Sequence, residues 1–182
     1  MSNPNRKYHT ADEVDKKYPK LANWTKAQMG LKAHLDKLVN DPNEYVRKAV
    51  AEHGHKDHLD KLVNDEDPWV RQAVARRGHK YHLDKLVKDK KAWVRAAVAN
   101  HGHKEHLDKL VNDRDDWVRQ RVAEHGHKEH LDNLVDDPHS PVRVAVARRG
   151  HKEHLDKLVN DPDDYVRHEA KNQLRKLKNA KP

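Results

Sequence analysis

The chain has 182 residues, of which 35% are hydrophobic and 37% charged, and its formal net charge is +8. The absence of cysteine excludes disulfides, thiolate zinc sites and cysteine nucleophiles. No apolar run is long enough to span a membrane, and the segment 1–17 lacks the apolar centre of a secretory signal, so we expect a soluble cytoplasmic protein with no membrane partner.

Residues 1–30 predict an N-terminal cap that contains a degenerate copy of the repeat described next. Ala27 and Gly30 hold their places in that repeat, whereas Leu21 and Ala22 stand where an aromatic residue and a valine recur later. A terminal repeat that departs from the pattern is typical of the end of a stacked array.

From Leu31 to Leu174 the chain repeats with a period of 24 residues. Histidine recurs without a slip at His34, His58, His82, His106, His130 and His154, and glycines and Val-Arg pairs keep the same spacing. Six units in one register are the strongest signal in the sequence, and a fixed period of this size indicates a repeat architecture.

Each unit predicts two short helices. The motif DPNE at 41–44 indicates a helix that starts after an N-cap aspartate, a role we also assign to Asp65, Asp113, Asp137 and Asp161. Gly54 is placed to end this helix in the left-handed conformation, and residues 55–63 form the second helix. Helices this short bury their apolar faces only by stacking on their neighbours.

The last unit has Leu174 in place of its glycine and continues in a helical pattern. We therefore expect a longer closing helix followed by a basic C-terminal tail at 175–182. Three parts result: the cap at 1–30, six units at 31–174 and the tail.

The histidines raise the question of a metal site. Three units carry closely spaced triples, His53/His55/His58, His101/His103/His106 and His125/His127/His130. Imidazole binds zinc, copper and nickel. However, the first member is Arg77 or Arg149 in two other units, so we interpret the histidines as a stacked surface ladder and expect no metal and no cofactor.

Two further rows recur on the first helix. Arg47 and its equivalents follow an aspartate by six residues, which favours structural pairing with acids over a row of anion-binding groups. Tyr45, Trp69, Trp93, Trp117 and Tyr165 share one position at the edge of the apolar stripe. Core filling is the favoured role for these rings, and the alternative is an exposed hot spot for a protein partner.

Positions where the units differ are candidate partner contacts. They include Arg76, Arg77, Arg148 and Arg149 at the end of the first helix, to which the three tryptophans are added. The positive charge is uneven, and the block 79–102 forms the candidate nucleic-acid site: Lys80, Lys85, Lys88, Lys90, Lys91 and Arg95.

The pattern D-P-x-x-x-V-R-x-x-V-A, then glycine, then L-x-x-L-V-x-D, as in 41–51 and 59–65, resembles the leucine-rich repeat variant family, a short relative of HEAT repeats. The resemblance covers about 30–167 and implies an α-helical superhelix that serves as a binding scaffold. Some members carry an iron-sulfur cluster held by cysteines, which this chain lacks. HEAT-like DNA glycosylases are also similar, but their functional residues do not transfer to repeated positions.

We therefore expect an all-α, right-handed α-solenoid of six two-helix repeats with terminal caps. No phosphate-binding loop, H-E-x-x-H motif or isolated acid-base pair is present, so we expect no enzyme. The predicted function is a monomeric scaffold for another protein, with nucleic-acid binding as the alternative.

Overall fold

The computed structural model describes residues 10–19 and 21–179, and all regular structure in this part of the chain is helical. It divides into two compact units, Met1–Leu86 and Val87–Pro182. Residues 1–9 and 20 of the predicted cap and residues 180–182 of the predicted tail lie outside the described residues.

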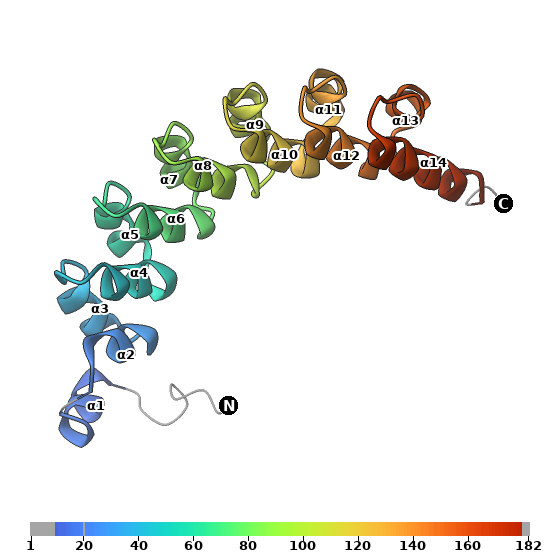
Figure 1. Cartoon of the computed structure of the whole chain (residues 1–182). Coiled ribbons are helices and arrows are strands. Elements are labelled where there is room, and N and C mark those ends of the chain that lie inside the picture. The colour runs from blue at the N-terminus through green and yellow to red at the C-terminus, as the bar shows by residue number, and fades with distance from the viewer. Residues whose placement is uncertain (1–9, 20, 180–182) are drawn as a thin grey trace. The chain divides into compact units, whose positions relative to one another are not determined.

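Unit 1 contains seven of the described helices (Figure 1). They are α1 (Ala11–Lys17), α2 (Asn23–Gln28), α3 (Lys32–Leu38), α4 (Glu44–His53), α5 (Lys56–Leu62), α6 (Pro68–Arg76) and α7 (Lys80–Leu86). From α2 onward the helices alternate between the first and second helix of a repeat, as the sequence predicts.

Unit 2 continues this alternation. Its helices are α8 (Ala92–Ala99), α9 (Lys104–Leu110), α10 (Asp116–His125), α11 (Lys128–Leu134), α12 (Ser140–Arg148), α13 (Lys152–Leu158) and α14 (Asp164–Asn179). The closing helix α14 has 16 residues, and it includes 175–179, which the sequence had placed in the tail.

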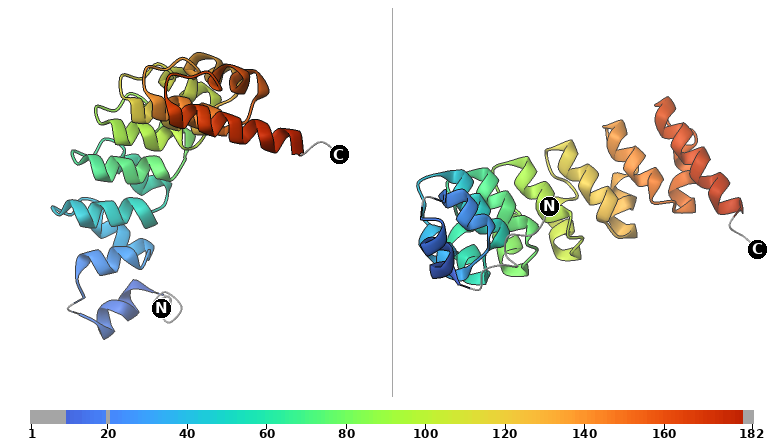
Figure 2. Two further views of the ribbon diagram at one scale, coloured as in Figure 1. Left: turned by 45° about the vertical axis from the view of Figure 1, so that its right-hand side comes forward. Right: turned by 90° about the horizontal axis from the view of Figure 1, so that it is seen from below.

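Within each unit the first helices form one layer and the second helices form another (Figure 2). Helix α4 packs between α2 and α6 in unit 1, and α10 and α12 pack between α8 and α14 in unit 2. Each second helix packs mainly on first helices. Each unit is therefore an all-α solenoid, as predicted, while the hand of the superhelix stays a prediction.

The apolar stripe of each repeat is buried between these layers. In one repeat Val46, Val50, Leu59 and Leu62 have 4% or less of their surface exposed. Equivalent residues are buried in the repeats that follow. Because each stripe faces helices of its own and adjacent repeats, the burial that stabilises the fold accumulates along the stack.

The start of the first helix differs from the prediction. The helix is capped by Asp67, whose carboxylate accepts the Trp69 backbone N–H at 2.8 Å, and not by Asp65. Asp65 instead accepts the N–H of Asp67 at 2.9 Å and forms the turn before the helix. Each carboxylate oxygen can accept more than one hydrogen bond, so Asp65 can also accept hydrogen bonds from a different repeat.

The end of the first helix takes two forms. Gly30, Gly78, Gly102 and Gly150 have φ values of 68–73°, as predicted for a left-handed ending. Gly54 does not: its φ is −72°, and α4 runs to the residue before it. A Cβ atom there would lie 2.5 Å from the Val50 carbonyl oxygen, so close approach of the backbone requires glycine at this position.

Candidate binding face

The arginine row joins successive repeats. The Arg47 guanidinium donates to both carboxylate oxygens of Asp65, at 2.7 and 2.9 Å, and also to the carbonyls of Asp41 and Pro42. The same paired bonds link Arg95 to Asp113, Arg119 to Asp137, and Arg143 to Asp161. The favoured structural interpretation of this row is confirmed.

In these ion pairs each arginine charge is balanced by an aspartate carboxylate. Burial is the largest single influence on the pKa of Asp113 and would raise it, but the hydrogen bonds from Arg95 and the Asp115 backbone N–H, together with the charges of Arg95 and Arg114, hold that pKa below its usual value. Arg95 itself is 6% exposed. Its predicted place in a nucleic-acid site is therefore corrected: a buried guanidinium held by a carboxylate is not available to a phosphate.

The third histidine of each unit is buried, not part of a surface ladder. His34, His58, His82, His106, His130 and His154 are at most 4% exposed. His58 Nε2 lies 2.9 Å from Asp36 of the preceding repeat, and His82 Nε2 lies 2.8 Å from Asp60. The spacing that suggested a ligand set thus arises from contacts between repeats.

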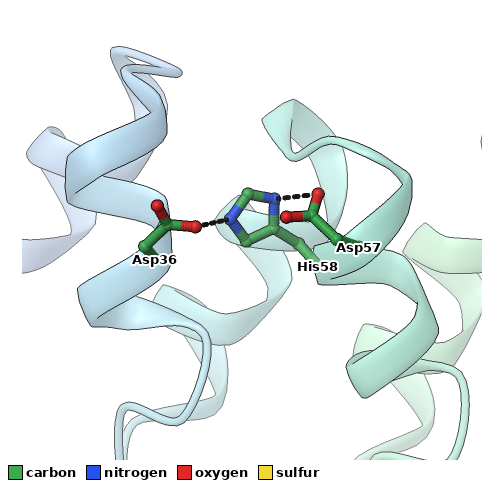
Figure 3. Close-up of side chains that lie close together, drawn as sticks. All are labelled: Asp36, Asp57 and His58. Atoms are coloured by element: carbon green, nitrogen blue, oxygen red, sulfur yellow. Dashed lines mark hydrogen bonds and ion pairs between the residues drawn. The ribbon is translucent and has the colours of Figure 1, made fainter.

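Asp36, Asp57 and His58 form the cluster closest in geometry to a metal site (Figure 3). The Lys32 ammonium lies 3.0 Å from Asp36 and 3.3 Å from Asp57, so a cation already bridges the two carboxylates. His58 Nδ1 accepts the His55 backbone N–H at 3.0 Å, which places the ring proton on Nε2 facing Asp36. Both ring nitrogens are engaged.

Similar clusters recur at other junctions between repeats. Their members are Lys56/Asp60/Tyr81/His82, Lys104/Asp108/Glu129/His130 and Lys128/Asp132/Glu153/His154. The pKa of Asp36 is lowered mainly by the hydrogen bond from Lys32 and to a smaller extent by the one from His58. The pKa of Asp108 is lowered mainly by the hydrogen bond from His130 and then by the one from Lys104. We interpret these clusters as junctions that hold adjacent second helices.

The aromatic row is not core filling. Trp69 is 53% exposed and Trp117 is 40% exposed, while Trp93 is half-buried. The prediction placed these rings in the core because their position borders the apolar stripe. In the structure all three rings lie in the first turn of their helices, where Trp69 and Trp117 are exposed and Trp93 has its indole nitrogen buried.

Unit 1 presents three aromatic residues on neighbouring first helices: Trp24 on α2, Tyr45 on α4 and Trp69 on α6. Tyr45 is 66% exposed. A groove between α4 and α6 is lined by Glu44, Tyr45, Lys48, Asp67 and Trp69. We call this the α4–α6 groove.

Unit 2 has the same aromatic position, but its rings are accompanied by cations of the chain itself. Arg121 lies over the Trp117 ring at 5.6 Å, and Lys91 lies over Trp93 at 5.3 Å. Arg148 donates to the Tyr165 hydroxyl at 3.2 Å. A groove between α12 and α14 is lined in part by Pro141, Arg148 and Tyr165.

The paired arginines at the helix ends differ in their surroundings. Arg77, a predicted partner contact, donates to the carbonyls of Ala51, Glu52 and Gly54, and so caps the end of α4. Arg149 likewise donates to Glu124. Arg76, Arg148 and Arg149 are exposed, so the predicted set divides by contact and not by burial: Arg77 and Arg149 bind carbonyls of the preceding repeat, whereas Arg148 contacts the Tyr165 hydroxyl.

The predicted lysine cluster is also divided. Lys80 pairs with Asp84 at 3.9 Å, and Lys85 lies over the Tyr81 ring at 4.6 Å. Lys88 and Lys90 are exposed. These lysines belong to different compact units, and several have partners within the chain.

These geometries define a class of protein, a helical repeat scaffold whose arginine, aspartate and histidine rows hold the stack together. The chain is similar to a solved structure described as a leucine-rich repeat variant with a novel repetitive protein structural motif, at 31% identity, 93% coverage of this chain, 77% of that chain and a TM-score of 0.74. The chain belongs to the leucine-rich repeat variant family.

Two other solved structures match more weakly. An engineered protein has 18% identity and a TM-score of 0.35, with 98% of each chain covered. A designed armadillo repeat protein has 17% identity and a TM-score of 0.36, with 96% of this chain and 98% of that chain covered. No family model and no curated protein matches the chain. None of the described helices is both long and apolar enough to cross a membrane.

Proposed function

We propose that the chain is a scaffold that binds another protein through the exposed aromatic residues of its first-helix layer. The observation that carries this proposal is the exposure of Trp24, Tyr45 and Trp69 on three neighbouring helices of unit 1. Large aromatic side chains contribute much of the energy of protein interfaces, because they bury extensive apolar surface at a small entropic cost.

The remaining polar rows support this choice because they are used inside the protein. The Arg47 row binds aspartates and the buried histidines contact carboxylates of neighbouring repeats. Within the basic block 79–102, Arg95 is buried and paired with Asp113, which weakens the nucleic-acid alternative. The aromatic layer is the large apolar feature that these internal contacts leave at the surface.

A site-specific crosslinking experiment tests the proposal. Lys48→benzoylphenylalanine places a photoreactive group in the α4–α6 groove, and the same substitution at Lys61 places it on a second helix. We expect the probe at 48 to crosslink a discrete cellular protein that the probe at 61 does not capture. Equal capture at both positions, or crosslinks to nucleic acid alone, would contradict the proposal.

A second part of the crosslinking experiment removes the three exposed aromatic side chains. The triple variant Trp24→Ala/Tyr45→Ala/Trp69→Ala, carrying the probe at 48, should lose that crosslink. Tyr81→Ala is the matched control, because Tyr81 is 52% exposed but lies on the second helix α7. The control should retain the crosslink and both variants should keep their helical circular dichroism.

A further inference from the structure

Arg167 is the last arginine of the row that joins successive repeats, and it lies on α14 at the end of the first-helix layer of unit 2 (Figure 2). Its guanidinium donates to the carbonyls of Asp161 and Pro162 at 2.6 and 2.8 Å, as Arg47 does one row earlier in unit 1 to its own turn. Among the described residues, the carboxylate that pairs with it is that of Asp164 in the same helix. Its side chain is 33% exposed, against 7–11% for the four arginines that bind an aspartate of the following repeat.

The pair with Asp164 does not prevent Arg167 from binding a second carboxylate. The Asp164 side chain is 92% exposed, and ion pairs in contact with water are weak. Asp116 holds the same place two repeats earlier. Arg119, three residues after it, nevertheless binds Asp137 of the following repeat at 2.6 and 3.0 Å. The guanidinium of Arg167 is therefore held in place without the aspartate that covers its equivalents.

The side of α14 that carries Arg167 is basic. Lys171 stands where the preceding repeats have a fully buried alanine: Ala51, Ala75, Ala99, Ala123 and Ala147. Arg167, Lys171 and Lys178 share one face, because residues four and seven apart on a helix lie one above the other. Lys171, Arg175 and Lys178 are exposed, and no acid follows Glu169 in the helix. We call Arg167, Lys171, Arg175 and Lys178 the α14 stripe.

The charge of the α14 stripe decides which occupant it suits. A further repeat of the same kind would bury Lys171 in the place of a fully buried alanine, and burying an unpaired charge is unfavourable. A second copy of the chain is also a poor match, because its first aspartate of the row, Asp41, already accepts the Asn23 side chain at 2.8 Å. An acidic segment of a different protein complements the stripe.

We propose that the α14 stripe binds an acidic segment of a partner protein, and that Arg167 receives an aspartate carboxylate of that segment. The chain itself makes this contact at four junctions, where the aspartate also accepts the backbone N–H two residues on and so forms a turn. Arginine binds a carboxylate through two parallel hydrogen bonds, which select geometry as well as charge. This site goes beyond the proposed function, because it lies in unit 2 and uses no aromatic residue.

The test uses a fluorescein-labelled peptide, Asn-Asp-Pro-Asp-Asp-Tyr-Val, which has the sequence of residues 160–166 and therefore carries the aspartate turn. It is titrated with the full chain at low salt, where exposed charges are least screened, and followed by anisotropy. The matched peptide has asparagine in place of its first aspartate. We expect it to bind about tenfold more weakly, because it loses the charge-assisted pair. Equal affinity, or no binding of either peptide, would overturn the proposal.

Variants of the chain locate the site. Arg167→Lys keeps the charge but cannot bind a carboxylate through two parallel bonds, so it should abolish the preference for the aspartate peptide. Asp164→Asn removes the competing acid and should strengthen that peptide about twofold or more. Arg76→Lys is the matched control, because Arg76 is an exposed arginine on α6 in unit 1. Equal loss of preference in this control would reject Arg167, and all variants should keep their helical circular dichroism.

The lysines of the stripe are tested separately. Lys171→Gln/Lys178→Gln should weaken both peptides by a similar factor, since each peptide retains two further acids. Unchanged binding in this variant would show that the stripe does not take part and would overturn its assignment.

Two further measurements address other occupants. We expect the chain alone to sediment as a monomer; a dimer that dissociates in Arg167→Lys would show that the carboxylate comes from a second copy and would overturn the assignment to a different protein. A DNA duplex should fail to displace the peptide, and displacement at equal concentration would assign the stripe to nucleic acid instead. The crosslink at 48 reports on the aromatic residues of unit 1, so the failure of one proposal does not entail the failure of the other.

Discussion

Asp137 receives hydrogen bonds from both sides of a junction between repeats. Arg119 donates to it at 2.6 and 3.0 Å, and the backbone N–H of His139 donates at 2.9 Å. Both Asp137 and Arg119 are buried. The carboxylate therefore shapes the turn and neutralises a buried guanidinium at once.

Asp137→Ala should lower the free energy of unfolding by about 3 kcal/mol, because it leaves Arg119 buried without a counter-charge. Asp136→Ala is the matched control: Asp136 is 70% exposed in its side chain and pairs with Lys157 at the surface, so we expect a loss below about 1 kcal/mol. Urea denaturation of both variants measures the difference, and equal losses would contradict the structural role of Asp137.

At the scale of the element, the form in which a first helix ends depends on one residue of the next repeat, which lies against that helix end. Arg77 lies against the helix end at Gly54, and Arg149 lies against the one at Gly126. Both glycines have φ near −72°, and each helix continues to the residue before its glycine. In two other repeats the residue is His53, near Gly30, or His125, near Gly102, and these two glycines have a positive φ. The arginine satisfies carbonyls that the left-handed ending would otherwise accommodate.

Arg77→His should remove the three hydrogen bonds to the end of α4, destabilise the fold by about 2 kcal/mol and give Gly54 a positive φ. Arg76→His is the control, since Arg76 is exposed, and it should change the stability by less than about 0.5 kcal/mol. Urea denaturation and a structure of the variant provide both readouts; an unchanged Gly54 would refute the link.

Much of this element-level organisation could be predicted from the period and the apolar pattern. The two-helix repeat and the pairing of Arg47 with an acid both followed from spacing. The capping role of Arg77 did not, because its partners lie 23–26 residues away and the sequence shows only that the position varies. The exposure of Trp69 was missed because an apolar ring beside the stripe fits the core equally well.

For the whole molecule, repeated carboxylates link stability to pH. The pKa values of Asp36, Asp60, Asp108 and Asp132 are lowered by the lysine and histidine contacts at the junctions. A lowered pKa in the folded state means that these groups stabilise the fold above their unfolded pKa of about 3.9. That contribution is lost as the pH falls through their folded values.

Thermal unfolding should therefore show a Tm that drops steeply below about pH 4, where these carboxylates become protonated. The variant Asp108→Asn/Asp132→Asn should have a lower Tm at pH 7 and a shallower drop in acid, because two of the titrating groups are absent. Circular dichroism melts between pH 7 and 2.5 measure both slopes, and parallel curves would contradict this assignment.

The repeat-to-repeat bonds also bear on how such a chain changes length during evolution. Arg119 reaches forward to Asp137, while His154 reaches back to Asp132. A recombination event that excised residues 127–150 would bring Asp161 to Arg119 and Asp108 to His154, each an aspartate at the equivalent place in its repeat. Copies of 24 residues can thus be gained or lost while every surviving junction finds a matching partner.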